Sequence, residues 1–209
     1  MTDAPAELGR RWLALWGRIG ARGDGRTVLE LLTTLYSEPS RYYHTLAHIG
    51  DCLAELDHER TRAHRPDEAE LAVWFHDAVY DPRAGDNEAR SAELADRVLR
   101  DAGLADDSRA RIAGIVRATT HAELPTDNDT ALVCDADLAI LGASPERYAR
   151  YVGQIRDEFA WVPAPLFRQR RAAVLARFLD RATIYASPGF RERYEERARK
   201  NLSAELLEL

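Results

Sequence analysis

The stretch LAVWFHDAVYD, residues 71–81, places His76 and Asp77 inside an otherwise apolar run. Apolar side chains around the whole circumference of a helix predict that the helix is central and buried. A buried ionised carboxylate without a partner is very unfavourable, so such groups are usually paired or bound to a metal ion. Adjacent helical residues point about 100° apart. His76 and Asp77 can therefore share one ion only where the helix ends or distorts, and Asp81-Pro82 indicate an end nearby. The alternatives are a buried His–Asp hydrogen bond or an arginine salt bridge.

The same anomaly occurs in TALVCDADLAILG, residues 130–142, where Asp135 and Asp137 interrupt a second apolar run. Residues two apart on a helix face different ways, so we expect one aspartate to be a ligand and the other to cap or pair. Both lie on the flanks of the apolar stripe, and periodicity does not choose between them. A structural role for both, as caps or salt-bridge partners, is the alternative.

A third pattern is YYHTLAHIGDCLAEL, residues 42–56, in which His44 and His48 are four apart. The breaker Pro39 predicts a helix that starts near Arg41 to His44, and on that helix the two imidazoles would share a face. Two such histidines can bind one metal, or one can bind it while the other transfers protons. Surface or capping histidines would produce the same spacing.

Beyond these segments the apolar spacing is helical almost throughout, and no period-two run bounded by turn residues predicts a strand. Prolines and glycines divide the chain into helices, with Pro66, Gly103 and Pro145 among the clearest boundaries. We therefore predict an all-α, HD-domain-like helical bundle forming a single domain over residues 1–209. The metal-binding core is expected at about 41–142, with C-terminal helices 144–209 packing on it.

The charge and the apolar content of the chain exclude some classes of binding partner. The chain has 209 residues and a formal net charge of −6, which disfavours binding to a nucleic-acid polymer or an anionic membrane. No run approaches the ~20 apolar residues that span a bilayer. The two cysteines, Cys52 and Cys134, lie in apolar runs without CxxC spacing and are interpreted as small buried hydrophobes. With no signal-peptide pattern at the N-terminus, we expect a cytoplasmic protein.

Taken in order, the three segments form the pattern H…HD…D, which resembles the HD superfamily of metal-dependent phosphohydrolases. The element YHTLAH is similar to the YHNxxH element of cyclic-nucleotide phosphodiesterases, and CDADLAILG is similar to the DADRL element of small bacterial HD proteins. The segments FHDAVYDPRAGDNEARSAE and RARKNLSAEL extend the resemblance, from about Tyr42 to the end, to a bacterial group of predicted metal-dependent HD phosphohydrolases.

This resemblance implies a role for each motif residue. His44 matches the proton donor and His48 the metal ligand of the first element, while Asp137 matches the ligand of the last. We therefore expect His48, His76, Asp77 and Asp137 to bind the metal, and His44 and Asp77 to act in catalysis. The mixed nitrogen and oxygen donors predict one divalent ion, Mn²⁺, Co²⁺, Ni²⁺, Zn²⁺, Mg²⁺ or Fe²⁺, without selecting among them.

Three further residues are candidates for substrate binding. His121 is the only histidine between the HD pair and the distal aspartate, where dinuclear HD proteins place two, which favours a single metal. It could contact a substrate phosphate, complete a partial second site, or simply end a helix. Glu88 follows the HD loop, and Arg171 belongs to an arginine-rich segment suited to phosphate. With 29 Lys and Arg against 35 Asp and Glu, most arginines are expected to pair with acids instead.

The predicted function is metal-dependent hydrolysis of a small phosphate ester, with a nucleotide as one candidate. The motifs are specific for the fold but not for the substrate, because HD proteins include phosphomonoesterases, phosphodiesterases, nucleotide hydrolases and a few iron oxygenases. Two alternatives therefore stay open: an HD-type diiron oxygenase, and a catalytically silent module that binds a metal or a nucleotide.

Overall fold

The computed structural model describes residues 4–209; residues 1–3 of the predicted 1–209 domain lie outside the described residues. Within 4–209 all regular secondary structure is helical, which confirms the predicted all-α class. None of the helices described combines the length and the apolar character that crossing a membrane requires. The elements are α1 (Ala4–Arg18), α2 (Arg26–Leu35), α3 (Leu46–Glu59), η1 (Arg60–Arg62), α4 (Pro66–Phe75), α5 (Asn87–Asp101), α6 (Asp106–Ala118), α7 (Asn128–Leu138), η2 (Ala139–Gly142), α8 (Pro145–Glu158), α9 (Ala164–Leu179) and α10 (Pro188–Glu208).

Helix α4 is buried on every side from Ala69 onward, as the apolar run that starts at Leu71 predicts. All residues from Ala69 to Phe75 are buried, and the helix packs against α1, α3, α5, α6 and α7. Trp12 of α1 meets Trp74 edge-on with ring centroids 5.2 Å apart. Because this part of α4 has no solvent-facing side, the residues that directly follow its C-terminal end lie inside the protein.

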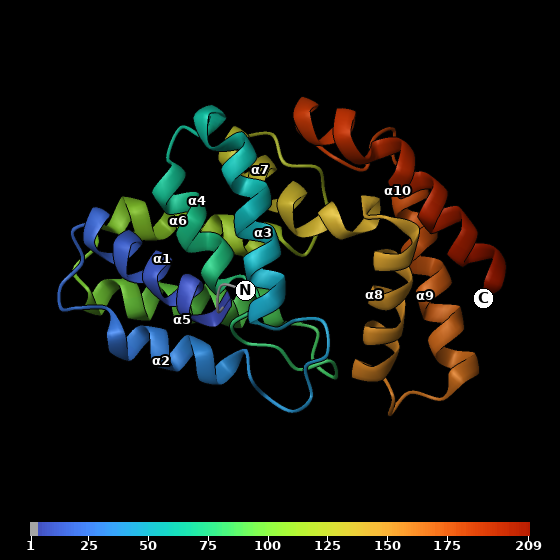
Figure 1. Cartoon of the computed structure of the whole chain (residues 1–209), viewed down its shortest axis with the longest axis horizontal. Coiled ribbons are helices and arrows are strands. Elements are labelled where there is room, and N and C mark those ends of the chain that lie inside the picture. The colour runs from blue at the N-terminus through green and yellow to red at the C-terminus, as the bar shows by residue number, and fades with distance from the viewer. Residues whose placement is uncertain (1–3) are drawn as a thin grey trace.

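The last three helices lie together on one side of the molecule, beyond α7 and η2 (Figure 1). Helix α10 packs along η2 and α9. The Asn201 side chain donates hydrogen bonds to the carbonyl oxygens of Leu141 (2.8 Å) and Ala143 (3.0 Å), and the Tyr185 hydroxyl donates to Leu138 O (3.0 Å). These bonds hold the C-terminal end of α7, the turn that carries Asp137.

Two helix boundaries differ from the sequence prediction. Helix α3 begins at Leu46, with Thr45 as its N-cap, so the predicted start near Arg41 to His44 is wrong. Helix α4 ends at Phe75, earlier than Asp81-Pro82 suggest. Both differences share a cause, because the buried Arg41 guanidinium binds the carbonyl oxygens of His44 (3.1 Å), Asp77 (2.7 Å) and Ala78 (3.0 Å). Arg41 is three positions from His44 but 36 and 37 positions from Asp77 and Ala78, so local sequence patterns do not report the two bonds beyond α4.

The crossing of α10 over η2 requires a glycine at position 142. A Cβ atom there would lie 2.6 Å from Tyr194 Cβ and 2.9 Å from the Tyr194 carbonyl oxygen, neither of which can rotate away. Gly142→Ala should therefore destabilise the protein by about 1–3 kcal/mol through overpacking. Gly153 is the control, since it lies within α8 with nothing within 4 Å of an added Cβ. Gly153→Ala should stabilise by about 0.5–1 kcal/mol. Urea unfolding tests both, and equal effects of the two substitutions would contradict this packing.

Candidate metal centre

His76 and Asp77 lie immediately after the last turn of α4, where the chain leaves the helix. His76 is the C-cap residue, and its Nδ1 lies 2.8 Å from Val73 O. The nitrogen that faces a carbonyl carries the proton, so a neutral His76 keeps a free lone pair on Nε2. Asp77 Oδ2 lies 3.0 Å from that Nε2. The end of the helix thus lets two neighbouring residues point at one place, which a continuous helix would prevent.

His48 of α3 and Asp137 in the last turn of α7 meet this pair. His48 Nε2 is 3.2 Å from His76 Nε2 and 3.1 Å from Asp137 Oδ1. The two remaining nitrogen–oxygen separations, His48 to Asp77 and His76 to Asp137, are both 3.6 Å. Four donor atoms, from α3, from α7 and from the segment directly after α4, therefore face one another.

The spacing of these atoms fits one shared ion. Donor atoms bound at about 2.0–2.2 Å to a tetrahedral or octahedral cation lie roughly 3–3.5 Å from each other. The five separations run from 3.0 to 3.6 Å. Two imidazole Nε2 atoms pointing at each other are also a poor arrangement in the absence of a proton or a cation between them. The donor set therefore suits a divalent metal.

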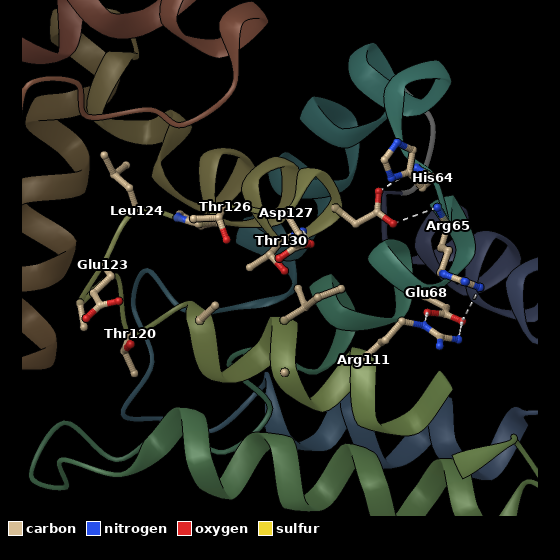
Figure 2. A pocket seen from close by; sticks show the side chains of 16 residues that line it. His64, Arg65, Glu68, Arg111, Thr120, Glu123, Leu124, Thr126, Asp127 and Thr130 are labelled. Atoms are coloured by element: carbon tan, nitrogen blue, oxygen red, sulfur yellow. Dashed lines mark hydrogen bonds and ion pairs between the residues drawn. The ribbon is translucent and has the colours of Figure 1, made fainter. Parts of the chain in front are cut away.

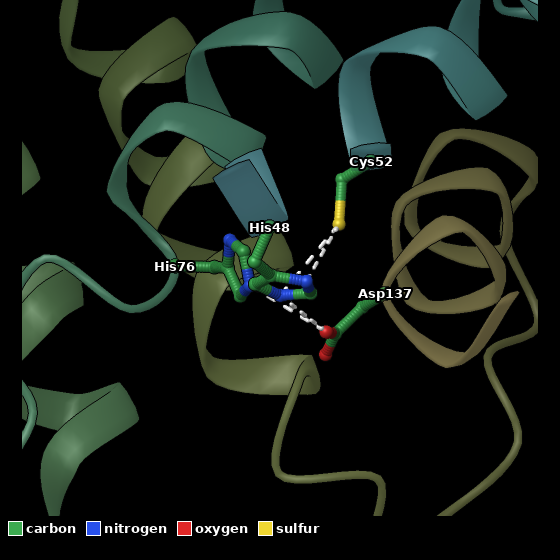
Figure 3. Close-up of side chains that lie close together, drawn as sticks. All are labelled: His48, Cys52, His76 and Asp137. Atoms are coloured by element: carbon green, nitrogen blue, oxygen red, sulfur yellow. Dashed lines mark hydrogen bonds and ion pairs between the residues drawn. The ribbon is translucent and has the colours of Figure 1, made fainter. Parts of the chain in front are cut away.

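The sulfur of Cys52 also belongs to this neighbourhood, which its interpretation as a simple buried hydrophobe missed. His48, Cys52, His76 and Asp137 form a compact group that could hold a metal ion (Figure 3). Cys52 Sγ, however, is 3.6 Å from both Nδ1 and Nε2 of His48. A sulfur equidistant from the two ring nitrogens lies over the ring instead of facing the Nε2 lone pair. We therefore favour Asp77, whose oxygen faces both histidines, as the fourth donor.

Asp135, the other candidate from the distal motif, is used elsewhere. Its Oδ1 accepts the backbone N–H of Ala186 (2.8 Å), and its Oδ2 accepts the N–H of Ser187 (2.7 Å) and the Ser187 hydroxyl. These bonds fasten the segment before α10 to α7. Asp135 thus faces away from the histidines, whereas Asp137 faces them.

The electrostatics of the cluster call for positive charge at its centre. Burial raises the pKa of Asp77 and Asp137, but His76 and the other nearby histidines together outweigh burial and lower the pKa of both below its ordinary value. The same carboxylates, Asp77 first, raise the pKa of His76 well above its ordinary value against the effect of burial. The two carboxylates are largely buried, with side chains 14% and 17% exposed, so a cation between them stabilises their charge, and a metal ion can replace the proton in that role.

His44 lies outside α3, so the expectation that it shares a helical face with His48 is wrong. It is held instead by Glu158, a buried residue at the end of α8 that the sequence analysis missed. Glu158 Oε1 accepts the backbone N–H groups of Tyr42, Tyr43 and His44 at 2.7–3.0 Å. Glu158 Oε2 lies 2.7 Å from His44 Nδ1 and accepts the Tyr80 hydroxyl at 2.8 Å.

This network fixes the His44 ring and its protonation. Burial raises the pKa of Glu158, but its interactions with the His44 ring and with the backbone N–H groups of His44 and Tyr43 together outweigh burial and lower that pKa to about 2. Burial lowers the pKa of His44, whereas Asp77 and Glu158 raise it, and the net direction is upward. With Nδ1 bonded to Glu158, Nε2 is the nitrogen left for other partners. One sequence feature could have identified Glu158: it is an acidic residue on the same helical face as the buried Tyr151 and Ile155.

His121 adopts a strained backbone beside the cluster. It follows α6 with φ of 53°, the only non-glycine residue with positive φ in the described range. Such conformations disfavour side chains with a Cβ and cluster at functional sites. Its Nε2 lies 2.8 Å from Asp137 Oδ2, and Arg181 donates to its carbonyl oxygen. The ring therefore bonds the Asp137 oxygen that faces away from His48.

A cavity of about 240 Å³ opens beside these residues. Its wall includes His44, Asp77, His121 and Asp137, and also the two other predicted substrate contacts, Glu88 and Arg171. The Arg171 guanidinium, however, donates two hydrogen bonds to Glu205, at 2.7 and 3.0 Å. Arg171 is thus neutralised by an internal partner, as the excess of acids over bases led us to expect for most arginines.

A larger cavity of about 800 Å³ lies away from the cluster, between α4, α6 and α7 (Figure 2). Its main ionic groups are already paired, since Arg111 donates two bonds of 2.7 Å to Glu68. Asp129 accepts the backbone N–H groups of His64 (2.7 Å) and Arg65 (2.9 Å). Volume alone would favour this cavity as the functional site, but none of the four donor residues lines it, whereas Asp77 and Asp137 line the smaller one.

No protein-family profile matches the chain, and no curated protein or solved structure was found to be similar to it. Its function is therefore inferred from the geometry of the cluster and its cavity, together with the motifs in the sequence.

The two aspartates of α7 provide a matched test of the metal centre. Asp137→Asn should weaken Mn²⁺ or Zn²⁺ binding at least ~100-fold, because even outer partners of metal ligands cost 10–100-fold when lost. Asp135→Asn should leave metal binding unchanged but lower stability by about 1–3 kcal/mol, since an amide cannot accept all three bonds. Calorimetric titration and urea unfolding measure the two effects. Loss of metal from Asp135→Asn, with Asp137→Asn still loaded, would reverse the assignment.

Proposed function

We propose that this chain is a metal-dependent phosphohydrolase of the HD type, acting on the ester bond of a small phosphorylated molecule. One observation carries the proposal: the His44 imidazole, oriented by Glu158, lines the same cavity as Asp77 and Asp137, two members of the cluster formed by His48, His76, Asp77 and Asp137. A site that only stores a metal has no need of an oriented proton-transfer group beside it. The H…HD…D resemblance supports the same conclusion.

Each residue of the site would have a separate role in hydrolysis. His48, His76, Asp77 and Asp137 would hold one divalent ion, whose Lewis acidity activates water and neutralises phosphoryl charge. His44 would donate its Nε2 proton to the departing oxygen of the ester, acting as a general acid. Glu158 would keep Nδ1 protonated, so that the second nitrogen stays directed at the cavity. Asp77, close to His76 and on the cavity wall, would also face the attacking water.

The oxygenase alternative requires ligands for a second ion. His121 is the only additional histidine bonded to the cluster among the described residues, through the outer oxygen of Asp137. A second ion at this point would have few protein donors, which favours the mononuclear hydrolase. Elemental analysis that found two irons per chain would favour the oxygenase instead.

Substitution of His44 separates the hydrolase from a silent module. His44→Ala should retain the metal while lowering turnover by ~10²–10⁴-fold for esters with poor leaving groups, because the general acid is lost. The loss should be smaller for nitrophenyl phosphate, whose leaving group needs little protonation. Metal content and initial rates on an ester panel measure both effects.

Two further variants serve as controls. In Glu158→Gln the amide oxygen can still accept the backbone N–H groups, but the amide nitrogen cannot accept a hydrogen bond from His44 Nδ1–H. This variant should therefore lose more activity on esters with poor leaving groups than on nitrophenyl phosphate, as His44→Ala does. His48→Ala should lose both metal and activity. A His44→Ala protein as fast as wild type on all esters would remove His44 from the mechanism. A metal-loaded wild type inactive on every ester would favour the silent module.

A further inference from the structure

The cavity beside the metal cluster is small and carries an unusual balance of charge. Its volume of about 240 Å³ lies below the ~300–1,000 Å³ of most drug-sized ligand sites. One wall is apolar, formed by side chains of η2, α9 and α10 such as Ile140, Leu175 and Leu202. A ligand that fits here is a compact molecule whose phosphate reaches the cluster.

Most of the charged groups in the wall are already paired within the protein. His44 bonds Glu158, Asp77 and Asp137 face the cluster histidines, His121 bonds Asp137, and Arg171 bonds Glu205. None of these groups has a free charge to offer the organic part of a substrate.

Glu88 and Arg177 are different. Both line the cavity, Glu88 from the first turn of α5 and Arg177 from the last turn of α9. In the described part of the chain, neither side chain forms a hydrogen bond or an ion pair, with each other or with any other residue, and Arg177 only rests over the Phe178 ring. The cavity therefore presents one free carboxylate and one free guanidinium from different helices.

A ligand complementary to this wall has charges of both signs besides its phosphate. We infer that the substrate is a phosphorylated α-amino acid, with its ammonium group facing Glu88 and its carboxylate facing Arg177. This inference rests on the proposed function and replaces a nucleotide with a smaller zwitterion. The guanidinium fork matches a carboxylate with two parallel hydrogen bonds, and a carboxylate accepts readily from an ammonium group. A purely anionic ligand would be repelled by Glu88, and a purely cationic one by Arg177.

Four phosphonates of one chain length test the inference, because their carbon–phosphorus bonds resist hydrolysis. L-2-amino-4-phosphonobutyrate carries both groups, 3-aminopropylphosphonate only the ammonium, 4-phosphonobutyrate only the carboxylate, and propylphosphonate neither. Calorimetric titration of the Mn²⁺-loaded protein should rank the first compound tightest. Each added group should improve affinity about tenfold, as expected for a hydrogen bond between charged groups.

Variants assign each preference to its residue. Glu88→Gln should remove the advantage of the ammonium while leaving that of the carboxylate, and Arg177→Gln should do the reverse. Glu93→Gln on α5 and Arg170→Gln on α9, both exposed and outside the cavity wall, should change neither. Equal binding of all four phosphonates by wild type would overturn the zwitterion inference and leave the hydrolase proposal intact. Failure of the metal-loaded protein to bind any of them would contradict both.

Discussion

The close packing of two largely buried carboxylates against two buried imidazoles is the constraint on which this structure depends. Asp77 and Asp137 are brought into the interior by different helices, and each would be very unfavourable there as an isolated charge. Positive charge at the centre of the cluster, from protonated histidine or from a metal ion, stabilises these carboxylates. The end of α4 at Phe75 makes this arrangement possible, because adjacent residues within a helix, such as His76 and Asp77, would point in different directions.

The C-terminal helices complete the site as well as covering it. Glu158 of α8 holds the segment before α3 and orients His44, so the proposed proton donor and its partner are 114 positions apart in the chain. Asp135 on α7 accepts hydrogen bonds from the backbone of the segment before α10. These bonds hold α7 in the position that directs Asp137 at the histidines. Helix α9 contributes Arg177 to the cavity wall. Changes in α8 to α10 should therefore alter the chemistry of the site even though the cluster itself belongs to α3, α4 and α7.

Local pattern predicted much of the helical architecture, while contacts between distant residues decided the details of the site. The apolar run around His76 and Asp77 identified a buried helix, and Pro145 marked the start of α8. The position of His44 outside α3 depends on Arg41 and Glu158, which bind backbone groups far away in sequence. Sequence likewise could not show that Arg171 is neutralised by Glu205, or that Cys52 lies over the His48 ring. Spacing along one helix reports which residues share a face, but not what lies opposite that face.

X-ray absorption spectroscopy of the Zn²⁺-loaded protein tests the central claim most directly, because zinc binds thiolate readily and would reveal Cys52 if that residue were a ligand. The four-residue centre predicts nitrogen and oxygen neighbours at about 2.0–2.2 Å, outer scattering from two imidazoles and no sulfur. A sulfur neighbour at about 2.3 Å would show that Cys52 binds the ion. A second metal at about 3.5–4 Å would show a dinuclear centre. Either result would contradict a single ion held by His48, His76, Asp77 and Asp137.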